Sequence, residues 1–350
     1  MRLKAFCQKN LLLKGIEMES LQTHSEKEKT GVKVSIGIPV YRVESYIERC
    51  ARSLFEQTMQ EGIEFIFVND CTPDRSIEIL KQVLEEYPHR KPWVKIIDHP
   101  ENCGVGKARR TAVENASGAY IIHCDPDDWV ELDMYETMYN EAVKNNADMV
   151  YCDIVQVDSS GNTLRVPSGY GTTADEVICE LFSRLYLGGP TVRMYRRAKA
   201  LLTAELEDRI EKFNYGEDLL RNVFSLRNCQ KVCKIDRALY WYRSNPNSIC
   251  SVRTINSRRD VFKLTVLLDE YFTEEKYQKS LDCSRRWALY SVISSRIITA
   301  GEWHALWKRA KRGIWKDPFW NIFQKGIFYM ACINFTLTSW LFRKLKGIKE

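Results

Sequence analysis

Short apolar segments alternate with amphipathic segments throughout residues 32–152. The apolar segments lie at residues 34–40, 65–68, 94–97, 119–124 and 148–152. Between them, hydrophobic residues recur at helical spacing, as in Tyr46, Ile47, Cys50 and Leu54. Strands that alternate with helices in this way predict a parallel α/β sheet with right-handed crossovers. With 350 residues, the chain is long enough for such a domain and an appendage, or for two domains.

The pattern changes on either side of this region. Residues 19–31 are polar and charged, and we expect residues 1–31 to form a disordered lead-in without chemistry. Beyond residue 153 the sequence is rich in loops, with strand-like segments at 191–195, 232–235 and 238–242 and a helix beginning near Asp218. Beyond Arg253 the sequence predicts helices. The expected division is therefore 1–31, 32–152, 153–253 and 254–350.

Polar residues follow the predicted strands at the points where those strands end. Tyr41, Asp70 and the acidic run 125–128 each stand in such a position. Ligands of parallel α/β sheets bind outside the carboxyl ends of the strands. We therefore expect these residues to share one crevice.

The acidic run Asp125-Pro126-Asp127-Asp128 has the composition of a metal site. Carboxylates packed this closely repel one another, and a divalent cation relieves that repulsion. Mn²⁺ or Mg²⁺, held by Asp125 and Asp127, would offset the charge of a nucleotide diphosphate. For an isolated run, a strand-to-helix turn with a capping aspartate is the alternative. Asp128 fits a helix start or a residue that supports the metal ligands.

Other candidate residues precede this run. The Asp70 carboxylate could accept a hydrogen bond from a pyrimidine N–H, or it could form an Asx turn. Tyr41 could stack beneath a base, although tyrosines at strand ends more often pack in the core. The glycine-containing loop at Gly104 leads into a helix whose positive end suits phosphate, which could place Lys107 or Arg109 near a diphosphate.

Two further candidates follow the run. Glu217 and Asp218 come after a glycine at a predicted helix start, where a carboxylate could act as a base or simply cap the helix. Arg243 follows an aromatic strand and could meet a phosphate, while the aromatic rings could line a sugar site or pack in the core.

Taken in order, these motifs resemble glycosyltransferase family 2, which has the GT-A fold. The matching segments are Ile38-Pro39-Val40-Tyr41, Val68-Asn69-Asp70, Asn102 through Arg109, Asp125 through Trp129, Tyr215 through Asp218, and Tyr242-Arg243 through Asn247-Ser248. The resemblance implies an α/β, GT-A-like fold with a mostly parallel sheet flanked by helices and a C-terminal helical extension. Residues 32–152 would then form the nucleotide-sugar-binding half of the domain, and residues 153–253 the acceptor-binding half.

The resemblance also implies roles for individual residues. Asp218 would be the general base of an inverting transfer, and Glu217 would help to place the acceptor. Asp125 and Asp127 would form the D-x-D metal motif. The residues expected to bind the nucleotide-sugar are Pro39, Tyr41, Asp70, Gly104, Lys107, Arg109, Asp125 and Arg243.

Departures from the family pattern concern specificity. Arg42 stands where asparagine is common, Pro126 replaces a small serine, and Cys71 replaces a glycine. No Q-x-x-R-W motif is present, which argues against the processive, membrane-spanning synthases of the family.

The C-terminal segment is basic and amphipathic. Residues 301–350 carry ten Lys/Arg against three acids, in a chain of net charge +6. Within them, the 17 residues 326–342 have no charge. As a helix they would span about 25 Å, which is short of a ~30 Å hydrocarbon core. We expect a helix lying on a membrane surface; a helix docked on the domain and a membrane span are the alternatives.

The expected protein is an enzyme that transfers a sugar from a nucleotide-diphosphate sugar, UDP-linked by preference, to a hydroxyl of a glycan or lipid-linked acceptor in cell-surface polysaccharide synthesis. Twelve scattered cysteines without a disulfide framework favour the cytosol, and the basic tail favours the inner face of the membrane over nucleic acid as a partner. Two alternatives remain. A nucleotidyltransferase would carry a glycine-rich basic loop after the first strand, which residues 39–42 lack; a non-catalytic basic membrane-binding protein would rely on the tail alone.

Overall fold

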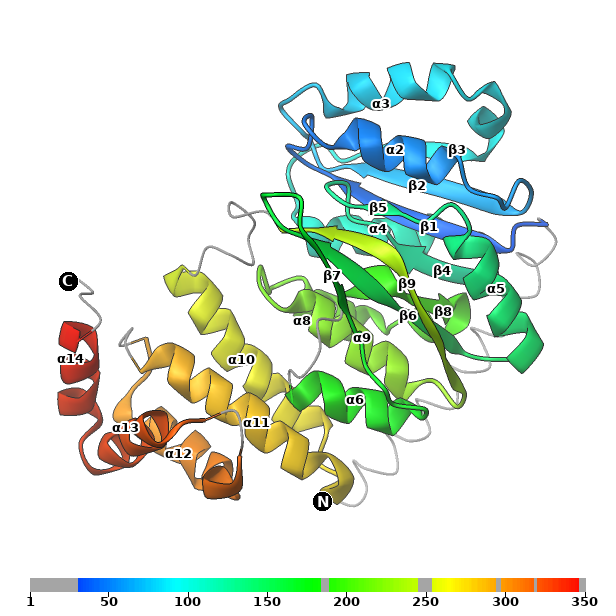
Figure 1. Ribbon diagram of the computed structural model, residues 1–350. Coiled ribbons are helices and arrows are strands. Elements are labelled where there is room, and N and C mark those ends of the chain that lie inside the picture. Colours follow the sequence, from blue (N-terminus) through cyan, green and yellow to red (C-terminus); the bar gives the residue numbers. More distant parts are fainter. Residues whose placement is uncertain (1–30, 184–188, 245–253, 294–296, 318–319, 346–350) are drawn as a thin grey trace.

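One continuous sheet forms the centre of the molecule, with helices on both faces (Figure 1). The computed structural model describes residues 31–183, 189–244, 254–293, 297–317 and 320–345. The strand order is β3-β2-β1-β4-β8-β6-β9-β5, and β7 pairs with β6 at the side. The expected lead-in 1–30 and the motif residues Asn247 and Ser248 lie outside the described ranges.

The first four strands form the parallel part of the sheet, as the sequence predicts. They are β1 (Val34–Val40), β2 (Ile63–Asn69), β3 (Val94–Asp98) and β4 (Tyr120–His123). All seven residues of β1 are buried, because β1 lies between β2 and β4 and is covered on both faces. The helices of this half are α2 (Ile47–Phe55), α3 (Ser76–Glu85), α4 (Val105–Asn115) and α5 (Met134–Asn145).

The rest of the sheet is mixed rather than mostly parallel. β8 runs antiparallel to both β4 and β6, while β9 is parallel to β6 and antiparallel to β5. A strand that enters without a crossover helix is free to pair antiparallel, which explains the short strand β5 directly after the acidic run. These strands are β5 (Trp129–Val130), β6 (Met149–Val157), β7 (Thr163–Val166), β8 (Arg193–Arg196) and β9 (Val232–Arg243).

Two differences from the predicted elements follow from this sheet. The boundary expected between residues 152 and 153 falls inside β6, so the two halves share one sheet. The two strand segments predicted between residues 232 and 242 form the single strand β9, with a register shift opposite Cys152 and Asp153. Such a shift inserts extra residues without ending the strand.

Hydrophobic cores lie on both faces of the sheet. One core packs α2, α3 and α5 against β1, β2 and β4, and a second packs α4 on the opposite face. Further helices bury the outer face of β6 and β8. These helices are α6 (Ala174–Ser183), α8 (Ala204–Ile210), α9 (Glu217–Arg227), α10 (Ile255–Tyr271) and α11 (Glu275–Val292).

The C-terminal helices pack on α10 and α11 in a core away from the sheet (Figure 1). They are α12 (Ala300–Ala310), α13 (Ile322–Ile333) and α14 (Phe335–Leu345). The uncharged segment 326–342, expected as one helix, is divided at Asn334. The backbone N–H of Asn334 donates to the Met330 carbonyl, and this hydrogen bond is the last of α13. The side-chain oxygen of Asn334 accepts a hydrogen bond from Leu337 N at 3.0 Å at the start of α14. None of the helices in the described ranges is long and apolar enough to cross a membrane.

Gly37, in the middle of β1, stands where the sheet and α4 approach most closely. A Cβ atom at this position would lie 2.8 Å from both Ala112 Cβ and His123 Nδ1. We therefore expect Gly37→Ala to lower the free energy of unfolding by about 1–3 kcal/mol through overpacking. Urea denaturation would measure it. Gly326→Ala, in an open helical position, is the matched control and should be neutral or stabilising; equal midpoints for the two variants would contradict the prediction.

Candidate active site

The acidic run after β4 is fixed to β9 through Asp128. The Tyr240 hydroxyl donates to Asp128 Oδ2 at 2.7 Å, and the Arg243 backbone N–H donates to Asp128 Oδ1 at 2.8 Å. Asp128 is buried, and burial together with the charges of Asp127 and Asp125 raises its pKa. Asp128 therefore supports the loop that carries the other two aspartates. It does not begin a helix, since β5 follows it.

Asp125 and Asp127 differ in what surrounds them. Arg109 Nη2 donates to Asp125 Oδ1 at 2.8 Å. Burial, and then the negative charge of Asp125, raise the pKa of Asp127 to about 6. A carboxylate held close to a second carboxylate favours a bound cation, because the cation offsets both negative charges. The pair therefore fits the oxygen chemistry that Mn²⁺ and Mg²⁺ prefer.

Two aspartates alone do not complete a metal site. Within the described ranges, the only three His, Cys, Asp or Glu side chains whose ligand atoms lie within 4.8 Å of one another are Asp70, His99 and Cys103. Phosphate oxygens usually complete the shell of a cation that few carboxylates hold. A cation at Asp125 and Asp127 would therefore depend on a bound diphosphate.

Arg109, on α4, connects the acidic run to the start of α9. Its Nη1 donates to Glu217 Oε1, and its Nη2 to Asp125. Arg109 and Glu217 are 6% and 4% exposed, so the ion pair is shielded from water. Burial works against the charge of Arg109, but Asp125, Glu217 and Asp218 together raise its pKa. Arg109 is thus the charged centre of the site.

The Glu217 side chain is buried beside Arg109 and does not reach the surface of the site. Burial raises the pKa of Glu217, and the Arg109 charge acts against that rise. A Cβ at Gly106 would lie 3.3 Å from Glu217 Cγ, so α4 and α9 approach closely here. The expected role of Glu217 was to place an acceptor. Its buried side chain holds Arg109 in position, and the acceptor role stays a prediction.

Asp218 is the more open of the two α9 carboxylates. It is partly exposed, and its Oδ1 accepts a hydrogen bond from Leu219 N at 2.7 Å. The N-cap residue of α9 is Gly216, at φ +86°, so Asp218 is not the N-cap, although its bond to Leu219 N satisfies one of the first N–H groups of the helix. The role of Asp218 as the base stays a prediction.

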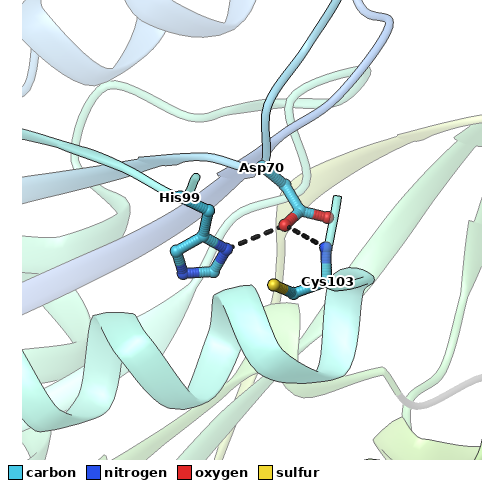
Figure 2. Close-up of side chains that lie close together, drawn as sticks. All are labelled: Asp70, His99 and Cys103. Carbon is cyan, nitrogen blue, oxygen red and sulfur yellow. Dashed lines mark hydrogen bonds and ion pairs between the residues drawn. The ribbon is translucent and has the colours of Figure 1, made fainter. Parts of the chain in front are cut away.

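Asp70 follows β2 and turns towards the loop before α4 (Figure 2). Its Oδ1 accepts from Cys103 N at 2.8 Å and lies 2.8 Å from His99 Nδ1, while its Oδ2 accepts from Gly104 N at 2.8 Å. His99 Nε2 in turn lies 2.9 Å from Thr111 Oγ1. Asp70 is 2% exposed. Its carboxylate holds the loop at Gly104 in place, and the expected contact with a base stays a prediction.

His99 was not identified from the sequence. It follows β3 directly, which is the position that singled out the other candidates, so the signal was available. With its Nδ1 directed to Asp70 and its Nε2 to Thr111, His99 has no nitrogen left for a metal unless these contacts change. The group in Figure 2 is therefore a hydrogen-bonded support.

The other expected donor-binding residues are distributed around this support. Gly104 is the N-cap of α4 at φ +88°, with no side-chain cap, so the first N–H groups of the helix are open to an anion. Tyr41 is 38% exposed, and Pro39 is buried in β1 opposite Val68. Lys107 Nζ lies 3.6 Å from Glu211 Oε1, so Lys107 pairs with Glu211 and not with the acidic run.

Arg243 lies on the other side of the run, beside stacked tryptophans. Its Nε donates to the Asp127 carbonyl at 3.2 Å, and its guanidinium lies 5.1 Å from the Trp129 ring. Trp129 stacks on Trp241 at 5.6 Å, and the Arg49 guanidinium lies 3.3 Å from Trp129. Burial and the charge of Arg243 lower the pKa of Arg49. Two guanidinium groups on one ring form a cationic border to the site.

An open groove extends from this border along α2. Its volume is about 500 Å³, and Arg49, Trp129 and Leu132 are among the residues that line it. Nothing in the sequence distinguished Arg49 from other arginines on an amphipathic helix, since its approach to Trp129 depends on the pairing of β5 with β9.

Comparisons with known proteins agree with this fold. The family model described as Glycosyl transferase family 2 matches residues 35–202. Glycosyltransferase EpsJ of Bacillus subtilis is 35% identical over 63% of each chain. EpsH of the same organism, also named as a glycosyltransferase, is 31% identical over 77% of each chain. The matched region thus spans less than two thirds of EpsJ.

Solved structures support the same fold. Residues 1–349 of S. aureus TarS in complex with UDP-GlcNAc superpose with a TM-score of 0.60 at 19% identity, covering 79% of each chain. At this identity the likeness concerns the fold. The GT-A-like architecture and the extent of the match to EpsH place the sequence with its relatives: the chain belongs to glycosyltransferase family 2.

Proposed function

We propose that the protein is an inverting glycosyltransferase that moves a sugar from a UDP-sugar to a hydroxyl of a glycan or lipid-linked acceptor. The observation that carries this proposal is the link made by Arg109. One buried guanidinium joins Asp125, the candidate metal ligand, to Glu217 next to the candidate base Asp218. Donor activation and acceptor activation would therefore occur on one rigid network.

The donor would lie across the carboxyl ends of β1, β2 and β4. Tyr41 and the Gly104 loop, which Asp70 holds, would border the nucleotide, and the open N–H groups of α4 would face its phosphates. A Mn²⁺ or Mg²⁺ ion bound at Asp125 and Asp127 would offset the charge of the departing diphosphate. Arg243, beside Asp127, would add a second positive group. S. aureus TarS, solved with UDP-GlcNAc, supports the choice of a UDP donor.

The acceptor hydroxyl would approach Asp218 from the opposite side. As its oxygen forms the bond to the sugar C1 atom, the Asp218 carboxylate would accept the proton, and the nucleotide diphosphate would leave from the other face of the ring. This in-line displacement inverts the configuration at C1. Glu217 and Arg109 would fix the position of Asp218 through the start of α9.

We also propose that the acceptor is a cell-surface polymer or its lipid-linked precursor, used at the inner face of the membrane. Similar proteins include the minor teichoic acid biosynthesis protein GgaB of Bacillus subtilis and a poly(ribitol-phosphate) beta-glucosyltransferase of Bacillus spizizenii. The groove lined by Arg49 and Trp129 offers an aromatic and cationic surface of the kind that such an acceptor would need.

A thermal-shift panel tests the donor site. UDP-sugars at a hundredfold excess over Kd, with Mn²⁺, should stabilise the protein by about 2.7 kcal/mol, and GDP-sugars or Mn²⁺ alone should not. Asp127→Asn should remove the part of the shift that depends on Mn²⁺, because one charged ligand is lost. Asp236→Asn, at an exposed surface position, is the matched control. No shift with any nucleotide-sugar, or an unchanged Mn²⁺ dependence in Asp127→Asn, would exclude this assignment.

A further inference from the structure

The outer side of α13 carries apolar residues that stay exposed in the described chain. Ile322 and Tyr329 stand seven residues apart, as do Phe323 and Met330, and Ile333 follows one turn later, so the five residues form one stripe on the helix. Their exposed fractions are high, reaching 87% at Ile333. The stripe consists of Ile322 (75%), Phe323 (60%), Tyr329 (37%), Met330 (47%) and Ile333 (87%).

In α14, four apolar residues face outwards, while Phe335, Phe342 and two polar residues are buried. Thr338 and Ser339 are buried, at 4% and 0% exposed. Leu337, Trp340, Leu341 and Leu345 are 51%, 45%, 38% and 74% exposed. Two phenylalanines already anchor α14 in the core, yet the helix exposes four large apolar residues to water, which packing on the domain alone does not require. The exposed stripe of α14 therefore has a use that packing within the chain does not explain.

An aromatic pair enlarges this surface. Trp315, 58% exposed, stacks on Tyr329 with ring centroids 5.3 Å apart. We name the exposed residues of both stripes together with Trp315 the C-terminal apolar face. Exposed apolar surface on this scale marks an interaction site in soluble domains. Tyrosine and tryptophan at its edge are typical of the boundary between water and lipid.

The charge around the C-terminal apolar face is positive. In residues 301–345 there are eight Lys/Arg against two acids, and one of those acids, Asp317, forms an ion pair with Arg286. Exposed basic residues lie at the end of α12, in the turn that follows, and at the end of α14. They are Lys308, Lys311, Arg312, Lys316 and Lys344.

We propose that the C-terminal apolar face docks on the surface of a bilayer that contains anionic lipids, with α13 and α14 lying in the interface. With 12 and 11 residues, these helices are about 18 and 17 Å long, which is too short to span a ~30 Å hydrocarbon core. Apolar residues would enter the acyl boundary, and the basic residues would meet lipid phosphates. This deepens the proposed function by naming where the acceptor is met, but the docking itself requires no catalysis.

A second copy of the chain is a less suitable occupant of this face. In a two-fold dimer the same patch contacts itself, so the basic residues of both copies would approach one another. Anionic lipid headgroups neutralise these charges instead. Charge complementarity thus favours a lipid surface.

Vesicle co-sedimentation of the full chain, without nucleotide, tests the proposal. We expect binding to phosphatidylcholine vesicles with about one third phosphatidylglycerol, at least tenfold weaker binding to pure phosphatidylcholine, and loss of the difference at about 1 M salt. Ile333→Glu on α13 and Leu337→Glu on α14 should each reduce binding by about tenfold or more. Leu164→Glu, which replaces a leucine that is 64% exposed on β7, is the matched control and should bind as the original protein does.

Three outcomes would overturn the docking. These are no binding to anionic vesicles, equal effects of Leu164→Glu and Leu337→Glu, and a dimer in sedimentation that Leu337→Glu dissociates while vesicle binding stays absent. The UDP-sugar thermal shift is measured on the same variants. An intact shift without vesicle binding rejects the docking alone, whereas vesicle binding without any nucleotide-sugar shift rejects the proposed transferase alone.

Discussion

Asp218→Asn is expected to lower the rate of sugar transfer by about 10²–10⁴-fold while leaving donor affinity within about twofold, because an amide cannot accept the acceptor proton. The Asp218→Asn variant should fold normally. Asp218 is partly exposed, and the hydrogen bond that it accepts from Leu219 N can be made by an asparagine oxygen. Steady-state release of UDP with acceptor present gives the rate, and the UDP-sugar thermal shift gives the affinity.

A comparison with Glu217→Gln sharpens this prediction. Because Glu217 is buried on Arg109, its replacement should lower stability and donor binding together, in contrast to the selective loss of rate in Asp218→Asn. Lowering the pH should not restore the transfer rate of Asp218→Asn, since asparagine has no ionisable group at that position. If Asp218→Asn transfers sugar at a near-normal rate, Asp218 is not the base.

Arg109→Met is expected to destabilise the protein by about 3–5 kcal/mol, since it leaves two carboxylates near one another without their shared cation. Denaturant unfolding at neutral pH would measure this loss. The loss should shrink as pH falls, because burial raises the pKa of Glu217 and protonation then removes its unpaired charge. Donor binding should fall as well, because Arg109 holds Asp125 in place.

Arg237→Met is the matched control for Arg109→Met. Arg237 pairs with Asp133 at 2.8 Å, but its side chain is 52% exposed, so the loss should be about 0–1 kcal/mol. Similar losses in the two variants, or a loss in Arg109→Met that grows towards low pH, would show that the buried ion pairs are not what Arg109 contributes.

The sequence predicted those parts of the molecule that local patterns determine. The buried strands β1, β2 and β4 appear as apolar runs, and the polar residues at their carboxyl ends follow from the rule for parallel sheets. The start of α9 at Glu217 was predicted to within one residue, because a glycine precedes two acids. The family resemblance, carried by motifs in the same order, is confirmed by the match to residues 35–202.

What the sequence did not predict depends on pairings between distant segments. The burial of Glu217 results from an arginine that lies 108 positions away, and the cationic border at Trp129 results from the antiparallel pairing of β5 with β9. The direction of the Asp70 carboxylate likewise depends on His99 and the Gly104 loop. In residues 326–342, the sequence contains Asn334, but hydropathy alone does not predict that this residue ends one helix and caps the next.

The region that matches the family model and the region that folds as one unit have different borders, because β9 lies inside the sheet. The family match ends at residue 202, yet β9 lies between β6 and β5 and supplies the two groups that hold Asp128. A gene fragment cut at the edge of the recognised homology would expose one side of β6, leave β5 without its partner strand and release the acidic run. The borders by which this sequence is recognised are therefore poor guides for truncation or domain grafting, and a self-sufficient unit has to extend at least through Arg243.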